Sequence, residues 1–367
     1  MRSLVEPDGS DRDSFGAVDV LIVDDSVVAR AVIAQTIDAS DRFSVVGAVG
    51  TVVAALEFLA RATVDVILLD IELPGVDGLT ALPELIAAGN GAKVVIVSSR
   101  ADERGATTVR ALALGAVDTL TKPSASALSG RFGAALVTKL EALFEHPGRV
   151  PPALPSSAAA LPERGSAPVR PVSSSADYDI VAIGASTGGI HALNQLLRAI
   201  PAGFRLPIVI TQHLPTSFMR YFAAQIATLS GRPCEVAVEG QRIRPGRIVV
   251  APGDAHLKCV RLVDGGGAFR LTREAVASGC MPSVDPMLAS LADVYGPRML
   301  AIVLSGMGRD GAEGARRVHE AGGSVIVQDR ESSVVWGMPG AVAEAGVADA
   351  VLSPDAIGRL IASRRRP

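Results

Sequence analysis

The feature that most constrains the fold is a repeated alternation of short aliphatic runs with longer stretches rich in Ala and Leu. It extends over residues 19–143 and returns from residue 178 to about residue 363. Between the two blocks, residues 147–176 are rich in Pro, Ser and Ala and show no apolar periodicity. Alternating strands and helices form parallel sheets that helices cover on both faces. The sequence therefore predicts an α/β protein with two doubly wound parallel-sheet domains.

We predict four segments along the chain. Residues 1–17 form a polar, disordered leader, and residues 18–136 form the first domain. Residues 147–176 form a linker that is semi-extended where prolines cluster, and residues 177–363 form the second domain. The N-terminus is acidic, and no stretch approaches 18 uncharged apolar residues. We therefore expect neither a secretory signal nor insertion into a membrane.

Composition argues against several classes of protein. The formal net charge of −3 disfavours a basic protein that binds nucleic acid. The cysteines Cys234, Cys259 and Cys280 lie far apart and form no CxxC pair. This spacing disfavours a disulfide framework or a zinc ribbon and fits a reducing compartment. We expect a cytoplasmic protein with no nucleic-acid partner.

The expected strands of the first block end in residues that carry chemistry. These strands are Val18–Val23, Phe43–Val49, Val64–Leu69, Lys93–Val97 and Val117–Thr121. Asp24 and Asp25 follow the first strand, Asp70 the third, Ser98 the fourth and Lys122 the fifth. The carboxyl ends of parallel strands share one edge of the sheet. We therefore expect these five side chains to form one pocket.

Three carboxylates in one pocket repel one another unless a cation is bound. Mg²⁺ prefers oxygen ligands, and beside a carboxylate it suits phosphoryl transfer. We predict that Asp70 is the nucleophile, forming an acyl phosphate, and that Asp24 and Asp25 hold the metal. Ser98 and Lys122 would contact the phosphoryl oxygens. The alternative is that each aspartate only caps a helix or forms a turn.

These motifs resemble those of response-regulator receiver domains over about residues 18–136. The matching motifs are Asp24-Asp25, Leu69–Gly78, Ser98 and Lys122-Pro123. The resemblance implies a flavodoxin-like fold with Asp70 as phospho-acceptor. It also implies Mg²⁺ held by Asp24, Asp25, Asp70 and the backbone carbonyl of Glu72. Ser98 and Lys122 stand at the family's switch positions.

The second block presents a serine on a glycine-rich turn. An expected strand, Tyr178–Gly184, runs through Ala185-Ser186-Thr187-Gly188-Gly189 into an expected helix, Ile190–Ala199. The turn fits a dinucleotide-binding loop, a G-x-S-x-G nucleophile elbow, or a helix start that Ser186 merely caps. The dinucleotide interpretation is weak because Ser186 replaces the second glycine of the fingerprint and the next strand, Leu206–Thr211, does not end in an acidic residue.

A histidine and an aspartate are available to activate this serine. His213 alone among the histidines ends a strand next to the one that carries Ser186, where a general base is needed. Asp310 lies in the Gly-rich turn after Met299–Ser305 and would orient His213. Its alternative role is to cap the helix expected at Ala312–Glu320. The order serine, histidine, aspartate differs from that of α/β-hydrolases, so we expect this chemistry on a different fold.

Together these segments resemble the chemotaxis protein-glutamate methylesterases over about residues 178–345. The matching stretches are Ile183–Gly189, Gln212–Pro215, Ala251–Asp254, Pro282–Asp285, Ser305–Gly311 and Val335–Pro339. The resemblance implies a Rossmann-like catalytic domain with Ser186 as nucleophile, His213 as base and Asp310 as the orienting acid. Thr187 and Met307 are implied neighbours of the developing oxyanion.

The implied activity is hydrolysis of glutamate methyl esters on the cytoplasmic helices of methyl-accepting chemoreceptors, giving glutamate and methanol. Deamidation of receptor glutamines is also implied, and the esterase site would need no cofactor. A chemotaxis histidine kinase would phosphorylate Asp70 and thereby relieve packing of the receiver over the catalytic cleft. Cys280 and Met281, and separately Met219, depart from the family pattern and are expected to alter receptor contacts.

Two other classes of function are weighed against the enzyme. The first is a non-catalytic binding module that the receiver switches. The second is a transcription factor, which is weaker because the chain lacks a basic recognition helix and its second block is larger than a helix-turn-helix module.

Overall fold

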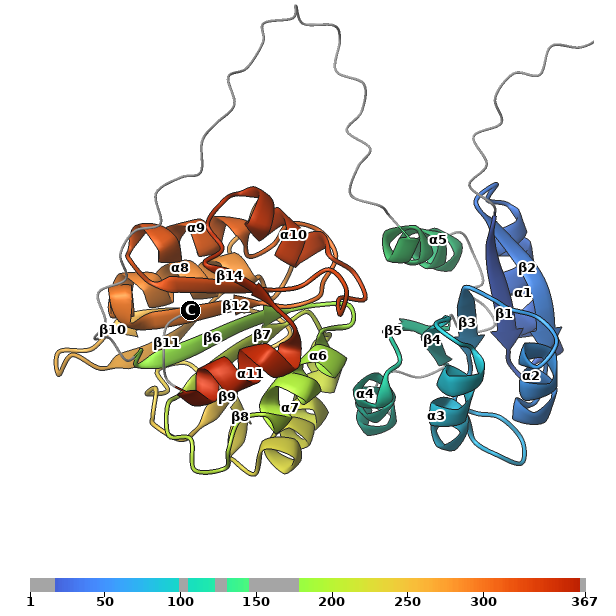
Figure 1. Ribbon diagram of the computed structural model, residues 1–367, viewed down its shortest axis with the longest axis horizontal. Helices are drawn as coiled ribbons and strands as arrows, with labels where there is room; N and C mark the ends of the chain where they lie inside the picture. The colour runs from blue at the N-terminus through green and yellow to red at the C-terminus, as the bar shows by residue number, and fades with distance from the viewer. Residues whose placement is uncertain (1–16, 99–104, 123–130, 145–177, 364–367) are drawn as a thin grey trace, which may run out of the picture.

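The computed structural model describes residues 17–98, 105–122, 131–144 and 178–363, and its regular elements form two α/β domains (Figure 1). The predicted linker at 147–176, Pro123 and all of the predicted leader except residue 17 lie outside the described residues. Those assignments therefore stay predictions.

The N-terminal domain is built on a five-stranded parallel sheet with the order β2-β1-β3-β4-β5. Its strands are β1 (Val18–Val23), β2 (Phe43–Val49), β3 (Val66–Leu69), β4 (Lys93–Ser98) and β5 (Asp118–Thr121). All five predicted runs are strands, and none of their ends is displaced by more than two residues. The strand order is that of flavodoxin-like folds, which confirms the predicted fold class.

Helices cover both faces of this sheet (Figure 1). They are α1 (Val27–Asp38), α2 (Val52–Leu59), α3 (Gly78–Ala88), α4 (Gly105–Leu114) and α5 (Arg131–Phe144). Val20 and Ile22 of β1 join the apolar cluster of α1 and α5, whereas Leu21 and Val23 join that of α2, α3 and α4. Successive strand side chains point to opposite faces, so one aliphatic run supplies both cores.

The C-terminal domain has a seven-stranded parallel sheet with the order β14-β13-β12-β6-β7-β9-β8. The strands are β6 (Ile180–Ala185), β7 (Ile208–Gln212), β8 (Cys234–Val236), β9 (Ile248–Val250), β12 (Met299–Val303), β13 (Ser324–Gln328) and β14 (Ala350–Leu352). The chain builds outward from β6 on one side and then from β12 on the other. Ligand sites in such sheets lie where the strand order reverses, which here is the edge beyond β6 and β12.

Helices also cover both faces of the second sheet (Figure 1). One layer holds α6 (Gly189–Arg198), α7 (Thr216–Ser230) and α11 (Pro354–Ser363), and the other holds α8 (Val284–Tyr295), α9 (Ala312–Glu320) and α10 (Gly337–Glu344). A short 3-10 helix, η1 (Gly296–Arg298), follows α8. An antiparallel pair, β10 (His256–Arg261) and β11 (Gly267–Thr272), packs beside α8. No helix in the described ranges has the length and apolar character needed to cross a membrane.

Apolar packing holds the two domains side by side. Helix α4 packs against α6 and α7, and one continuous apolar cluster joins Leu112 of α4 to Ile190 and Phe218 of the second domain. The Asn194 side chain donates a hydrogen bond to the carbonyl of Ala113 at 3.1 Å. The β5 edge of the first domain therefore faces α6 of the second (Figure 1).

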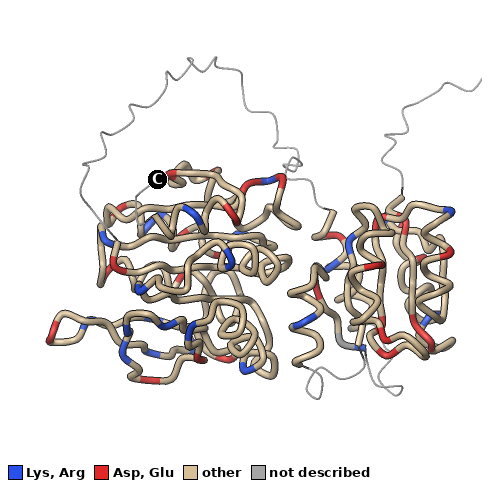
Figure 2. The backbone as a smooth tube through the Cα atoms, turned by 60° about the horizontal axis from the view of Figure 1, so that its bottom comes forward, with Lys and Arg blue, Asp and Glu red and all other residues tan. Residues whose placement is uncertain are grey.

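Charged residues are distributed over the outside of both domains. Lys and Arg are interspersed with Asp and Glu along the backbone (Figure 2). Several of these residues form exposed pairs within a single helix, such as Arg317 with Glu320 on α9 and Arg359 with Asp355 on α11. Exposed pairs of this kind contribute about 0–1 kcal/mol each. The aliphatic cores, rather than these pairs, determine the stability of the domains.

Candidate active site

Ser186 lies in the turn between β6 and α6, at the edge where the strand order reverses. Its backbone N–H donates to the carbonyl of Ser305 at 3.0 Å, and its carbonyl accepts from the Gln212 side chain at 2.8 Å. Gly188 has a φ of 74°, which favours glycine. A Cβ on Gly306 would lie 2.8 Å from the Cβ of Ser186. Glycine therefore lets the turn after β12 approach the serine.

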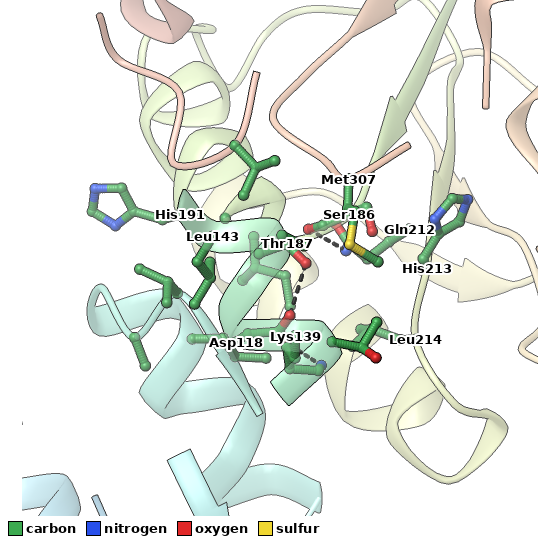
Figure 3. Close-up of a pocket in the computed structure, with 18 of the residues that line it drawn as sticks. Asp118, Lys139, Leu143, Ser186, Thr187, His191, Gln212, His213, Leu214 and Met307 are labelled. Atoms are coloured by element: carbon green, nitrogen blue, oxygen red, sulfur yellow. Dashed lines mark hydrogen bonds and ion pairs between the residues drawn. The ribbon is translucent and has the colours of Figure 1, made fainter. Parts of the chain in front are cut away.

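Ser186 does not cap the helix that follows it. The N-cap residue of α6 is Gly188, and no side chain forms the capping hydrogen bond. The capping interpretation of Ser186 is therefore wrong. The serine is half-buried and lines a cavity of about 540 Å³ (Figure 3).

His213 and Asp310 meet at the same edge of the sheet. His213 follows β7, and Asp310 lies in the turn between β12 and α9. Nε2 of His213 lies 2.8 Å from Oδ2 of Asp310, although the residues are 97 positions apart. The histidine side chain is 15% exposed and that of the aspartate is 1% exposed. A buried carboxylate therefore holds the imidazole of a residue that also lines the cavity.

The carboxylate of Asp310 is fixed at the N-terminus of α8. The Ser283 hydroxyl donates to Oδ1 at 2.7 Å, and the backbone N–H of Val284 donates to Oδ2 at 2.7 Å. Asp310 therefore satisfies donors at the start of α8, whereas the N-cap residue of the following helix, α9, is Gly311. The alternative role predicted for Asp310, a cap for the helix at 312–320, is wrong. Helix N-termini stabilise negative charge, which favours the ionised carboxylate.

The ionisation of the pair follows from these contacts. Burial raises the pKa of Asp310, but hydrogen bonds from His213 and Ser283 outweigh burial and hold the pKa below its usual value. Burial lowers the pKa of His213, but the contacts with Asp310 and Cys280 outweigh it and raise the pKa to about 9. The imidazole is therefore a stronger base than a solvated histidine.

Ser186 and His213 line the same cavity without forming a hydrogen bond to each other. Figure 3 shows both side chains with Met307 and Gln212 around them. Within residues 178–363, and toward the described part of the other domain, the Ser186 hydroxyl forms no hydrogen bond. The structure therefore joins two of the three predicted catalytic side chains and places the third in the same cavity.

Thr187 and Met307, the residues expected beside the developing oxyanion, both line this cavity, and their role there stays a prediction. Met307 lies in the turn after β12, and its side chain is 42% exposed. The Thr187 hydroxyl donates to Oδ2 of Asp118 in the first domain at 2.7 Å (Figure 3). The turn that carries the serine is therefore in direct contact with the other domain.

The first domain forms the opposite wall of the cavity. The backbone N–H of Gly188 donates to the carbonyl of Val117 at 3.0 Å, immediately before β5. Lys139 of α5 donates to Oδ1 of Asp118 at 2.7 Å, and both residues line the cavity (Figure 3). The face formed by α4, β5 and α5 therefore covers the opening in front of Ser186.

A second cluster lies at the strand ends of the first domain. Carboxylate oxygens of Asp24, Asp25 and Asp70 lie within 4.8 Å of one another. Nζ of Lys122 lies 2.5 Å from Asp24 and 2.6 Å from Asp70. The Ser98 hydroxyl is buried and has no hydrogen-bond partner among the described residues. The four charged residues predicted to share one pocket are therefore together.

This acidic cluster fits a hard divalent cation. Asp24 and Asp70 are buried, whereas Asp25 is exposed and leaves the cluster open to solvent. Burial raises the pKa of Asp70, the Lys122 ammonium lowers it, and the neighbouring carboxylates raise it further. The backbone N–H of Glu72 donates to Asp70 at 3.1 Å, which places residue 72 beside the cluster. Oxygen donors with excess negative charge are what Mg²⁺ binds.

Comparison with known proteins finds a matching family for each half of the chain. Residues 20–129 match the family model of the response regulator receiver domain, and residues 181–361 match that of the CheB methylesterase. "Protein-glutamate methylesterase/protein-glutamine glutaminase 1" of Paramagnetospirillum magneticum is 41% identical over 92% of this chain and 93% of that protein. The chain belongs to this family.

A second curated relative matches over a similar extent, and one solved structure matches about half of the chain. The protein-glutamate methylesterase/protein-glutamine glutaminase of the group 2 operon of Rhodospirillum centenum is 40% identical over 94% of each chain. The crystal structure of the Thermotoga maritima CheB methylesterase catalytic domain is 36% identical, with a TM-score of 0.48, and covers 51% of this chain and 96% of that one.

Three residues near the methylesterase site received no role at that site from the sequence, although Cys280 was expected to alter receptor contacts. Ser283 holds Asp310, Asp118 of the receiver domain binds Thr187, and Cys280 has its sulfur within 4.8 Å of ligand atoms on His213 and Asp310. These contacts join segments that are distant along the chain, so no local pattern could reveal them. Ser283 lies in a stretch that matched the family motif, which was the only available signal.

The predicted effect of Met219 on receptor contacts is wrong, because its side chain is 2% exposed within α7. Met281 is 43% exposed and is available for such a contact.

Proposed function

We propose that this chain is a phosphorylation-controlled serine hydrolase that demethylates glutamate methyl esters on the cytoplasmic helices of chemoreceptors. It also deamidates glutamines on the same helices. The observation that carries the proposal is the 2.8 Å contact of His213 with Asp310 at the sheet edge that presents Ser186. Membership of the methylesterase family supplies the substrate class.

Ser186 is the nucleophile. As its hydroxyl oxygen attacks the ester carbonyl carbon, the hydroxyl proton passes to His213. Asp310 binds Nε2 of the ring, so Nδ1 is the nitrogen that receives this proton. Asp310 keeps the ring in this tautomer and stabilises the imidazolium without taking a proton itself. The backbone N–H groups of Thr187 and Met307 stabilise the oxyanion.

The same residues complete the reaction. Collapse of the tetrahedral intermediate breaks the bond to the methoxy oxygen, and His213 returns the proton to form methanol. Water then attacks the acyl-enzyme, with His213 again as base, and releases glutamate and free Ser186. A glutamine substrate follows the same path with ammonia as the leaving group.

The contact between Ser186 and His213 forms when the enzyme becomes active. Catalytic hydrogen bonds are often long in unliganded enzymes and tighten with substrate. Here Ser186 and His213 line one cavity whose other wall is the receiver domain. A receptor helix must displace that wall to reach the serine, so the described arrangement is the inactive one.

Strand β5 connects the phosphorylation site to the esterase site. Lys122 follows one end of β5 and pairs with Asp70, and Asp118 at the other end binds Thr187. A phosphoryl group on Asp70 attracts Lys122 and the Ser98 hydroxyl. Movement of Lys122 at its end of β5 shifts the strand and weakens the contact of Asp118, at the other end, with the methylesterase domain.

Asp70 accepts the phosphoryl group from a chemotaxis histidine kinase. Asp24, Asp25, Asp70 and the backbone carbonyl of Glu72 would hold Mg²⁺, which neutralises charge on the transferred group. The esterase reaction uses side chains and backbone N–H groups of the chain together with water, and needs no cofactor. We assign the receiver to residues 18–136 and the methylesterase domain to residues 177–363, after a leader at 1–17 and joined by a linker at 147–176.

The test is methanol release from methylated chemoreceptors. Ser186→Ala should abolish release while circular dichroism and thermal unfolding stay as in the parent protein. Ser290→Ala, at a serine on α8 outside the cavity, is the matched control and should retain release. A non-catalytic binding module predicts no methanol from the parent protein, and full activity of Ser186→Ala would exclude this serine as nucleophile.

A further inference from the structure

Cys280 lies beside the proposed catalytic pair, and the mechanism gives it no part. Its sulfur, a ring nitrogen of His213 and a carboxylate oxygen of Asp310 all lie within 4.8 Å of one another. Cys280 and His213 are partly exposed, and Asp310 is buried. A small solute can therefore reach the cluster from the side of the thiol and the ring.

Sulfur, nitrogen and oxygen ligands together are typical of zinc sites. Zn²⁺ binds thiolate, imidazole and carboxylate in tetrahedral geometry, and three protein ligands leave the fourth position to water. At normal zinc bond lengths the ligand atoms are separated by about 3.3–3.6 Å. The three side chains therefore need only small movements to enclose the ion.

The surroundings of Asp310 already orient it as a metal ligand. The Ser283 hydroxyl and the Val284 N–H each donate to its carboxylate at 2.7 Å. Such outer hydrogen bonds fix the direction of a ligating carboxylate and increase metal affinity. The other ligand cluster among the described residues contains carboxylates alone and suits a hard cation.

We propose that Cys280, His213 and Asp310 form a Zn²⁺ site and that its occupation inhibits the esterase. Binding releases the thiol proton and, where the ring is charged, its second proton to solvent, and the imidazole keeps one proton on the nitrogen that does not bind the metal. The metal then holds the ring that should accept the proton of Ser186. The inhibition rests on the proposed function, whereas the binding of zinc does not.

The binding is tested on the full chain with reduced thiols, using Co²⁺ as a spectroscopic probe and excess Mg²⁺ to saturate the acidic cluster. Co²⁺ should give a thiolate-to-cobalt charge-transfer band in the near ultraviolet, and Zn²⁺ should displace it. Cys280→Ala and Cys280→Ser should each lose the band. Cys234→Ala, a matched control at a partly buried cysteine on β8, should keep it.

The inhibition is tested by methanol release with increasing Zn²⁺, each variant being compared with its own rate in EDTA. The parent protein should be inhibited reversibly. Because Cys280→Ala lacks one ligand, the Zn²⁺ concentration that gives the same inhibition should be at least about tenfold higher in this variant. A band that persists in both Cys280 variants, or no band in the parent protein, overturns the site. A band without inhibition overturns the regulatory part, and a band in a protein that releases no methanol contradicts only the proposed function.

Discussion

Asp310 shows how a single buried charge can organise a site. Its side chain is 1% exposed, yet it accepts hydrogen bonds from an imidazole, a hydroxyl and backbone N–H groups. Each donor compensates for part of the solvation that the carboxylate loses on burial. The same carboxylate accepts a hydrogen bond from the first backbone N–H of α8 and holds the His213 ring. One side chain therefore both stabilises the start of a helix and orients the imidazole.

The raised pKa of His213 predicts a rate that increases with pH. Only the neutral ring accepts the serine proton, and a raised pKa keeps the ring protonated to higher pH. In EDTA, methanol release should therefore rise with a midpoint above the usual histidine value of 6.5 and toward about 9. A pH profile at saturating substrate measures this midpoint.

Asp310→Asn should change that profile in two ways. Loss of the negative charge lowers the pKa of His213, so the midpoint moves to lower pH. Loss of the correct tautomer lowers the plateau rate by about 10³–10⁴-fold. Asp293→Asn, at an exposed carboxylate on α8, is the control and should keep the parent profile. A midpoint that does not move in Asp310→Asn would contradict the assigned cause of the shift.

At the scale of elements, strand ends determine which side chains meet. Ser186 follows β6, His213 follows β7 and Asp310 lies beyond β12, and these three strands are neighbours in the sheet. The register of β6 and β7 pairs Ala185 with Gln212. Ser186 and His213, which follow these residues, therefore leave the sheet at the same height along the strands. Aliphatic runs that end in polar residues were therefore enough to predict the strands of the first sheet and to place Ser186, His213 and Asp310 at one edge of the second.

Other features could not be predicted from the sequence, for physical reasons. The strands β8, β9 and β14 have only three residues each, too few to show a pattern. The capping of α8 by Asp310 joins positions 26 residues apart, where local rules suggested α9. Contacts such as Asp118 with Thr187 depend on docking of one domain on the other, which no periodicity encodes.

Gly188→Ala tests the turn that carries Ser186. Its φ of 74° is unfavourable for alanine, and a Cβ would lie 2.5 Å from Val334. Together these effects should lower the free energy of unfolding by about 2–4 kcal/mol. Urea unfolding followed by fluorescence of Trp336, the single tryptophan, measures the methylesterase domain itself.

Gly308→Ala separates backbone strain from the steric clash. Gly308 has a φ of 80°, and a Cβ added there would meet nothing within 4 Å. Alanine at this position should cost about 1–2 kcal/mol, from the backbone alone. Equal losses in the two variants would show that the approach of Val334 to Gly188 is unimportant.

At the scale of the whole molecule, the receiver covers the cavity through an apolar interface and a few directed contacts. Asp118→Ala removes the acceptor for the Thr187 hydroxyl while Lys139 keeps its hydrogen bond to the carbonyl of Thr119 at 2.9 Å. A hydrogen bond to a charged group is worth about 1.5–3 kcal/mol. The unphosphorylated enzyme should therefore gain about tenfold or more in methanol release.

Asp41→Ala is the control for this change, because Asp41 is an exposed carboxylate between α1 and β2, away from the interface. It should leave the basal rate of the full chain as it was. If Asp118→Ala also leaves the basal rate unchanged, the contact with Thr187 does not restrain the enzyme.

Phosphorylation tests the path from Asp70 to the esterase site. With Mg²⁺ and a small phosphodonor, methanol release should rise in the parent protein and not in Asp70→Asn, which lacks the accepting oxygen. Asp77→Asn is the matched control, because Asp77 is the exposed N-cap of α3 and asparagine caps equally well. Chelation of Mg²⁺ should remove the stimulation in the parent protein and in this control.

Combining the two sites decides whether β5 carries the signal. Lys122 pairs with Asp24 and Asp70 at one end of the strand, and Asp118 binds Thr187 at the other. If the phosphoryl group acts by weakening the contact of Asp118 with Thr187, then that contact is already absent in Asp118→Ala. Phosphodonor should therefore stimulate Asp118→Ala less than the parent protein, because coupled changes are not additive. Equal stimulation of both proteins would show that the signal reaches the methylesterase domain by a route other than this contact.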